Sequence, residues 1–275
     1  MAPNVRRQAM RIYRCELTLL EPTFFSSREV SAYYQTEPLI SNIALAYALG
    51  FCQAPYFNDG TIYYQEHLTR LNDQGLYVTP ATIVGEPRFS MGQFNAQADA
   101  YWSAFANNVI VTRPDGAWAE KRSQAWYIEW PDGRQQKVGL ENRPQHGRIR
   151  YLAIGNQAVA YVLNREALKL PNYIRLGKFM SKARVKSVEL AYDEIEDQDI
   201  QIPFLLNPAD LSTGMHLSAF DLVSVPPTPL IRNAVLSGHF YHLSDGTILP
   251  ADMRFGVERL PADRLKKTAN KRERK

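Results

Sequence analysis

The residues of this sequence best suited to chemistry are cations clustered between Tyr173 and Lys186. If the chain is extended after Gly177, its side chains alternate between two faces with a period of two residues. The predicted cationic face carries Lys178, Lys182, Arg184 and Lys186. A helix would leave Arg184 off this row, and Gly177 with the nearby valines favours a strand, or a loop followed by a strand.

A row of cations on one face suits a polyanion whose phosphates are regularly spaced. The longer stretch from Arg143 to Val188 holds ten basic residues and one acid, Glu166. Aromatic residues lie among these cations, which is typical of surfaces that bind single-stranded nucleic acid, although a solvated strand face is the alternative. We therefore predict an RNA-binding surface. It comprises Arg28, Arg148, Arg150, Arg175, Lys178, Lys182, Arg184 and Lys186.

Five histidines raise the question of catalysis or metal binding. His239 and His242 would lie on opposite faces of a strand, and no cysteine or second histidine pair accompanies them, so we predict no metal site. His146 lies within the basic stretch, and a metal-independent ribonuclease that uses it as general base is the competing function. Phosphate-binding loops, nucleophile elbows and dinucleotide fingerprints are absent from the sequence. We predict no catalytic residues and no cofactor.

Charge is distributed unevenly over the 275 residues, whose formal net charge is +4. The last fifteen residues, Pro261 to Lys275, hold seven basic and two acidic side chains. The basic stretch therefore lies in an otherwise acidic body, which makes it more informative. Acids concentrate directly after it, from Glu189 to Asp199, where we expect a solvated turn or a contact for a basic partner.

Composition indicates a globular protein, with 45% apolar and 22% charged residues. Cys15 and Cys52 lie in apolar surroundings without metal-like spacing, so we expect two reduced core residues of an intracellular protein. The sequence has no apolar run near the ~20 residues of a membrane span and no signal peptide. We therefore predict a cytoplasmic protein without membrane contact.

The elements that must position the cations alternate between strands and helices. Residues 11–20 predict a strand, and Pro38 to Leu49 an apolar helix ended by Gly50. A second helix is expected from Tyr63 to Asn72, stopped by Gly75, and then an edge strand at 76–84 interrupted by Pro80. Residues 149–164 continue the core, as strand or helix.

Residues 85–145 indicate an insertion, a projecting thumb of hairpins and loops. Asp132-Gly133 is a hairpin turn between two short predicted strands. The insertion combines aromatic and basic residues, which predicts contact with nucleic acid or a neighbouring subunit unless the tryptophans only form the hairpin core. The residues assigned to this contact are Arg113, Trp118, Lys121, Arg122 and Trp126.

The rest of the chain completes one α+β domain over residues 11–255. Prolines make 203–229 loop-rich, and Asp245-Gly246 forms the turn of a last hairpin. Residues 256–275 form a basic tail that is too poor in apolar groups to fold alone.

Five segments in order resemble one protein family. They are Tyr13-Arg14-Cys15-Glu16-Leu17, Phe24-Phe25-Ser26-Ser27-Arg28-Glu29, Thr36-Glu37-Pro38-Leu39, Ala46-Tyr47-Ala48-Leu49-Gly50 and Tyr173 to Lys182. With them the chain resembles the Csc-one, or Cas-five-type, subunit of the type I-D CRISPR effector complex (Cascade). The resemblance runs through most of residues 11–255.

The resemblance implies a ferredoxin-like (RRM-like) core of the repeat-associated RNA-binding (RAMP) superfamily with a protruding thumb. It implies a non-catalytic antiviral subunit that binds the 5′ handle of the guide RNA (crRNA), caps the foot of the complex and contributes to reading the motif that flanks the target DNA. Its implied protein partners are the backbone subunit and the large Cas-ten-type subunit. A relative in type I-C systems cleaves the CRISPR repeat RNA, so the ribonuclease alternative stays open, although no full catalytic set matches here.

Overall fold

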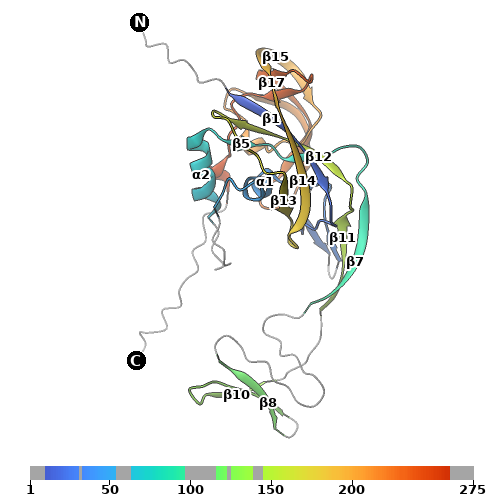
Figure 1. Ribbon diagram of the computed structural model, residues 1–275, viewed down its shortest axis with the longest axis vertical. Helices are drawn as coiled ribbons and strands as arrows, with labels where there is room; N and C mark the ends of the chain where they lie inside the picture. Colours follow the sequence, from blue (N-terminus) through green and yellow to red (C-terminus); the bar gives the residue numbers. More distant parts are fainter. Residues whose placement is uncertain are drawn as a thin grey trace. The chain divides into compact units, whose positions relative to one another are not determined.

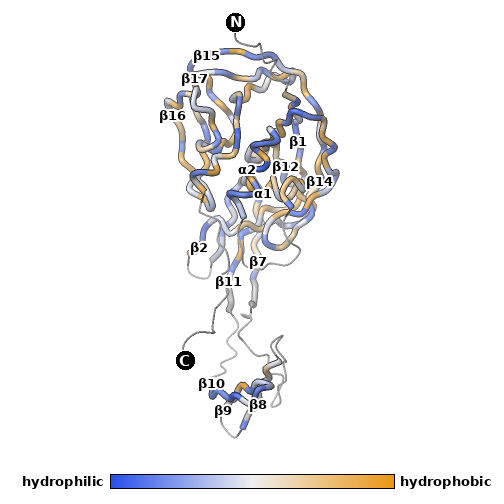
Figure 2. Tube along the Cα trace, turned by 90° about the vertical axis from the view of Figure 1, so that its left-hand side faces the viewer, coloured by the Kyte–Doolittle hydropathy of each residue, from blue (hydrophilic) through white to orange (hydrophobic). Residues whose placement is uncertain are grey.

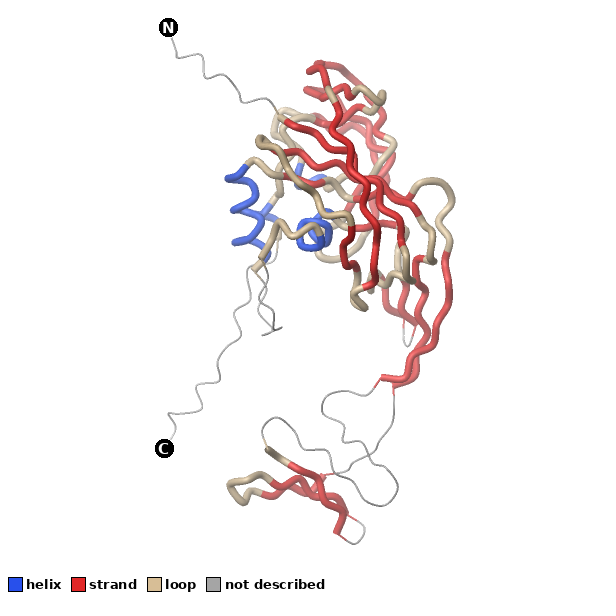
Figure 3. Tube along the Cα trace, viewed as in Figure 1, coloured by secondary structure: helices blue, strands red, loops and turns tan. Residues whose placement is uncertain are grey.

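The computed structural model describes residues 10–30, 33–53, 63–96, 116–122, 125–138 and 145–260. Within these ranges the chain forms two α-helices, the 3-10 turns η1 (Pro208–Asp210) and η2 (Val257–Arg259), and strands in four sheets (Figures 1 and 3). The predicted α+β class is confirmed, with strands dominating. No helix in the described ranges is long and apolar enough to cross a membrane.

The largest sheet has the N-terminal strand near its centre. Its strands are β1 (Arg11–Leu19), β4 (Leu39–Ile40), β5 (Tyr77–Val78), β6 (Ala81–Ile83), β12 (Gln157–Asn164), β13 (Tyr173–Leu176) and β14 (Ser181–Leu190). They hydrogen-bond in the order β13-β14-β1-β12-β6-β4, and β5 also pairs with β12. All these pairs are antiparallel. β1 pairs with β12 and with β14, two strands that lie far from it in the sequence.

Alternation of side chains along β1 separates a covered face of this sheet from an open one. Cys15, Leu17 and Leu19 are buried, whereas Arg14 and Glu16, which alternate with them, stay partly exposed. Figure 2 shows the same mixture of hydrophilic and hydrophobic residues along the strands. Removing the apolar side chains from water stabilises the fold by about 25 cal/mol for each Å² buried.

Both cysteines are free and buried, as the sequence predicts. Burial raises the pKa of the Cys15 thiol to about 12 and that of Cys52 to about 11. Thiols in this state are inert core groups.

Two helices, α1 (Asn42–Ala48) and α2 (Tyr64–Gln74), lie on the same side of the sheet (Figure 3). The predicted start of the first helix at Pro38 is wrong, because β4 occupies Leu39–Ile40 and Ser41 caps the helix by accepting a hydrogen bond from the Ile43 N–H. The second helix agrees with the prediction and ends at Gly75.

The strand predicted at 76–84 is divided by Pro80 into β5 and β6, as expected. Its predicted edge position is wrong for β6, because Thr82 pairs with Val159 of β12 on one side and with Leu39 of β4 on the other. The short strand β4 covers the edge that the sequence pattern left open.

A second sheet contains β15 (Tyr192–Ile202), β16 (His216–Val223), β17 (Leu230–Leu243) and β18 (Ile248–Pro250). The order is β15-β17-β16, with β18 also paired to β17. The acidic segment predicted as a turn instead forms β15, because Ile195 and Ile200 pack against the core while the carboxylates stay exposed. The hairpin at Asp245-Gly246 is confirmed. The sequence did not predict β16, which lies within the proline-containing segment 203–229 that was expected to be loop-rich.

Contacts divide the chain into two compact units. The second unit comprises Val30–Tyr34 and Met91–Ile149, and the first unit holds the rest. The predicted insertion at 85–145 overlaps the second unit, although its limits and the single-domain assignment stay predictions.

Two small sheets involve the second unit. One has the order β10-β9-β8, from β8 (Trp118–Arg122), β9 (Ala125–Glu129) and β10 (Gln135–Val138), and it confirms the hairpin at Asp132-Gly133. The other has the order β2-β3-β11-β7, from β2 (Arg28–Val30), β3 (Tyr33–Gln35), β7 (Phe89–Ala96) and β11 (Gln145–Leu152). The strand β7 lies at the start of the segment that the sequence predicted as a thumb of hairpins and loops.

A buried carboxylate joins α1, β5 and the last described segment of the first unit. Asp210 is 1% exposed and accepts hydrogen bonds from the Asn42 side chain at 2.5 Å, the Tyr77 hydroxyl at 2.9 Å and the Gly256 N–H at 2.8 Å. Burial raises the pKa of Asp210 to about 7, although these donors favour the charged form. The network crosses more than 200 residues of sequence and fixes the helix side of the first unit.

Candidate nucleic-acid interface

The C-terminal part of the basic stretch forms a hairpin of β13 and β14. Ala183 and Val185 are buried, whereas Arg184 and Lys186 are exposed and Lys182 is partly exposed. The predicted alternation is therefore confirmed for Lys182, Arg184 and Lys186. It is wrong for Lys178, which lies in the turn between the strands and not on their face.

The turn is fixed by a close approach to the loop after β1. Gly177 has a φ of 72°, and a Cβ added there would lie 2.4 Å from the Phe24 carbonyl oxygen. The same oxygen accepts a hydrogen bond from the Lys178 N–H at 2.9 Å. Phe179, which is 56% exposed, stacks on Phe24 with ring centroids 5.3 Å apart. The turn therefore presents Lys178 and Phe179 at the surface from a rigid support.

The loop beneath the turn is held by a buried hydroxyl. Thr36 is fully buried, and its Oγ1 donates to the Phe25 carbonyl at 3.0 Å and accepts from the Phe25 N–H at 3.1 Å. Two of the segments that resemble the family, those beginning at Phe24 and Thr36, thus meet where the turn packs.

The cations of the hairpin differ in their partners. Arg184 and Lys186 form no ion pair with any described residue, and they face Thr18 and Glu16 of β1. The Lys182 ammonium lies 4.4 Å from the centroid of the Tyr173 ring, a cation–π contact. These side chains keep their charges available at the surface.

Arg175 and Lys182 lie directly opposite each other, an arrangement that is unfavourable for like charges. Glu21 offsets part of this repulsion. One of its carboxylate oxygens lies 3.5 Å from Arg175 Nη1 and also accepts a hydrogen bond from the backbone N–H of Lys182 at 2.8 Å.

The row of cations on β14 ends before Glu189. Glu189 accepts two hydrogen bonds of 2.8 Å from the Arg11 guanidinium, and this pairing holds the pKa of Glu189 below its usual range. The positive patch is thus confined to the part of β14 that precedes this ion pair.

The other predicted RNA-binding residues are separate from this row. Arg28 pairs with Glu37 at 2.9 Å. Arg150 is partly exposed, stacks over the Phe89 ring at 4.4 Å and donates to the Thr36 carbonyl, and its contact with an RNA phosphate stays a prediction. Arg148 is exposed on β11 in the second unit.

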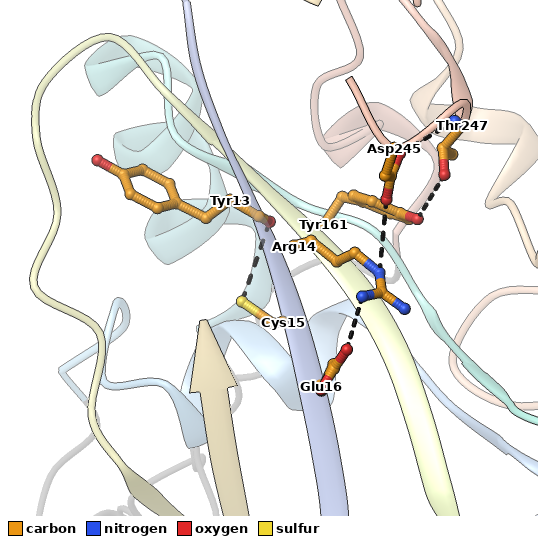
Figure 4. Close-up of polar contacts among 7 residues, drawn as sticks. All are labelled: Tyr13, Arg14, Cys15, Glu16, Tyr161, Asp245 and Thr247. Carbon is orange, nitrogen blue, oxygen red and sulfur yellow. Dashed lines mark hydrogen bonds and ion pairs between the residues drawn. The ribbon is translucent and has the colours of Figure 1, made fainter. Parts of the chain in front are cut away.

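A polar network that the sequence did not reveal covers part of the open sheet face (Figure 4). Arg14 Nη1 donates to Glu16 at 2.6 Å, and its Nε lies 3.6 Å from an Asp245 oxygen. Tyr161 and Thr247 share a hydrogen bond of 3.0 Å beside them. Arg14 is therefore neutralised, and the turn of the last hairpin is attached to the sheet. A hollow of about 640 Å³ remains beside it, lined among others by Arg14, Tyr173, Arg184 and Lys186.

The residues assigned to the insertion are only partly described. Trp118 is partly exposed on β8, and Arg122 is exposed, pairs with Glu129 and lies 5.7 Å from the Tyr127 ring centroid. Trp126 and Lys121 lie on β9 and β8, but their side chains, like the whole of Arg113, are outside the described residues.

The histidines and acids of the described part are dispersed over strands, helices and turns. No three His, Cys, Asp or Glu residues of the described part converge as metal ligands would. His239 lies on the second sheet, 3.2 Å from Glu194 and 3.8 Å from Asp252. The basic hairpin belongs to a different sheet. His146 lies on β11, and its side chain is outside the description.

One family of known proteins matches a part of the chain that includes this cationic hairpin. The model of one family, the type I-D CRISPR-associated protein Cas5/Csc1, matches residues 10–258. The chain belongs to this family. Among curated proteins the comparison finds no match.

The match confirms the resemblance seen in the sequence. As a Cas5/Csc1 family member, the chain is associated with a type I-D CRISPR complex. The matched range contains β1, the β13–β14 hairpin and the second sheet, and it ends at residue 258, near the start of the basic tail. Both strands that carry the exposed cations thus belong to the family's shared region.

Proposed function

We propose that this Cas5/Csc1 chain is a non-catalytic subunit of a type I-D CRISPR surveillance complex that binds the 5′ handle of the crRNA. The observation that carries the proposal is the unpaired cation row of β14, where Arg184 and Lys186 have no ion-pair partner in the described part of the chain. Cations spaced along an exposed strand suit a phosphate backbone, and Tyr173 beside them suits an unstacked base.

In this proposal the chain caps the foot of the complex and contributes to recognition of the motif that flanks the target DNA. The insertion, with Arg113, Trp118, Lys121, Arg122 and Trp126, contacts nucleic acid or the backbone and large subunits. A ferredoxin-like RAMP core is consistent with the central position of β1 between β12 and β14 and with two helices on one side of their sheet.

Salt dependence of RNA binding tests the phosphate contacts. Each lost contact to a single strand flattens the slope of log K against log salt by about 0.7. The double variant Arg184→Ala/Lys186→Ala should therefore lower the slope by about 1.4 for binding of repeat RNA.

The matched control is Arg70→Ala/Arg232→Ala, which removes the same charge from exposed side chains on α2 and β17. It should leave the slope unchanged. Equal effects of both double variants would mean that net charge alone acts, and the assignment of this face would be withdrawn.

The absence of catalysis is tested separately. The purified protein is incubated with repeat RNA in EDTA, and we expect tight binding without a cut. A single cut at the handle that disappears in His146→Ala would overturn this part of the proposal and favour the metal-independent ribonuclease.

A further inference from the structure

An aromatic hollow of about 560 Å³ lies between α1, α2 and the loop after β1. Its volume is within the range of about 300–1,000 Å³ that is typical of small-ligand sites. We call it the aromatic pocket and define it by Phe25, Tyr47, Tyr63, Tyr64, His67 and Lys178.

Contacts between the rings hold the wall of the aromatic pocket. The Tyr47 hydroxyl and His67 Nδ1 are 2.8 Å apart, and the Tyr47 ring centroid lies 5.7 Å from His67 and 5.9 Å from Tyr64. Tyr63 lies against His67 at 5.6 Å. Tyr64 and His67 are three residues apart on α2 and so share one side of the helix. The pocket is therefore built before any ligand enters.

Lys178 brings a positive charge to these rings. It is exposed, its backbone is anchored to Phe24, and no described residue pairs with its ammonium. No carboxylate is among the residues that line the pocket, all of which lie in the described part of the chain. An aromatic wall beside an uncompensated cation suits a flat, aromatic ligand that carries negative charge, which is the chemistry of a nucleotide.

A second hollow, of about 700 Å³, adjoins the aromatic pocket over α1. Ala44 and Tyr47 line both hollows. The second hollow is also lined by Tyr173, Arg175 and Lys182, again with no carboxylate among its described lining residues. The two hollows thus form a path from the aromatic pocket to the edge of the cationic hairpin.

We propose that the aromatic pocket holds one unstacked nucleobase of an RNA strand whose backbone crosses α1 toward Arg175 and Lys182. This inference rests on the proposed function and gives it a position at which a base, and not only phosphate, is bound. Lys178 contacts the phosphate of the seated nucleotide. A side chain of a neighbouring protein is the other occupant to test, but Lys178, Arg175 and Lys182 line the two hollows and no carboxylate among the described residues does, which favours nucleic acid.

The first experiment compares a short oligouridine RNA with an abasic oligonucleotide of the same length. Stacking on aromatic side chains changes affinity by about 5- to 150-fold per base. Tyr63→Leu keeps apolar volume but removes the ring, and Tyr63 makes no side-chain cap to α2. We expect this variant to lose about 5- to 150-fold in affinity for oligouridine and nothing for the abasic strand.

The matched control is Phe220→Leu, which removes a half-exposed ring from β16 in the second sheet and should leave both affinities unchanged. A second measurement needs no variant. Oligouridine that carries 5-iodouridine is photo-crosslinked to the wild-type protein, and the crosslink should map to the peptides that contain Tyr47 or residues 63–67.

The outcomes separate this inference from the proposed function. Crosslinks elsewhere, with unchanged binding by Tyr63→Leu, overturn the aromatic pocket even if Arg184→Ala/Lys186→Ala still lowers the salt slope. Normal RNA binding by Tyr63→Leu with loss of assembly with the other subunits overturns it in favour of a protein occupant. Failure of the wild-type protein to bind either strand overturns both proposals.

Discussion

Replacement of Gly177 by alanine tests how the β13–β14 turn is held in place. Gly177 is in the left-handed region with a φ of 72°, and an added Cβ would lie 2.4 Å from the Phe24 carbonyl oxygen. That oxygen belongs to the backbone and accepts the Lys178 N–H, so it cannot move without disturbing the loop after β1. The turn must shift away from the loop.

The expected cost is the sum of three effects. The left-handed conformation costs an L-residue about 1–2 kcal/mol. Loss of the Lys178–Phe24 hydrogen bond costs about 0.5–1.5 kcal/mol. Loss of the stack between Phe24 and Phe179 costs about as much again. Gly177→Ala should therefore lower the free energy of unfolding by about 2–5 kcal/mol.

Urea denaturation measures this loss, and Gly246→Ala is the matched control. Gly246 has a φ of 83°, but nothing lies within 4 Å of an added Cβ. It should lose only the conformational cost of about 1–2 kcal/mol. Equal losses in the two variants would refute the argument that the close approach to Phe24 holds the turn.

Two further predictions concern the buried carboxylate and the insertion. The folded state holds the Asp210 proton more tightly than the unfolded state, because burial raises the pKa of Asp210 to about 7. The free energy of unfolding should therefore fall as pH rises through the range from about 4 to about 7. Between about pH 5 and pH 8 we expect a decrease of about 2–3 kcal/mol. Urea denaturation of Asp210→Asn should lack this decrease, and an unchanged pH profile in the variant would contradict the assignment. Deletion of Asp115 to Gln136 should leave a soluble protein that fails to join the complex in co-purification. Normal assembly of the deletion variant would remove the insertion from the proposed contacts.

Local sequence patterns were sufficient for several elements. The period of two in Lys182, Arg184 and Lys186 predicted the exposed face of β14, because alternation in a strand depends only on consecutive residues. Asp132-Gly133 and Gly75 predicted a turn and a helix end, since both reflect backbone preferences of the residues themselves. The five ordered segments also identified the family.

Long-range packing decided what the patterns could not. The charge of the acidic segment predicts a turn, yet Ile195 and Ile200 pack against the core, so the segment forms the strand β15. Arg150 is predicted as a phosphate ligand from its place in the basic stretch, and only the structure shows that it also stacks on Phe89. Both outcomes depend on partners tens of residues away, which no local window contains.

By itself, the sequence determined the family, the α+β class and the strand that carries the cations, because each depends on residue order and short spacing. Only the tertiary structure decided which cations lie together. It placed Lys178 in a turn against Phe24 and beside rings from α1 and α2. The physical reason is that antiparallel pairing of β1 with β12 and β14, and packing of the helices on the sheet, bring together side chains separated by more than 100 residues.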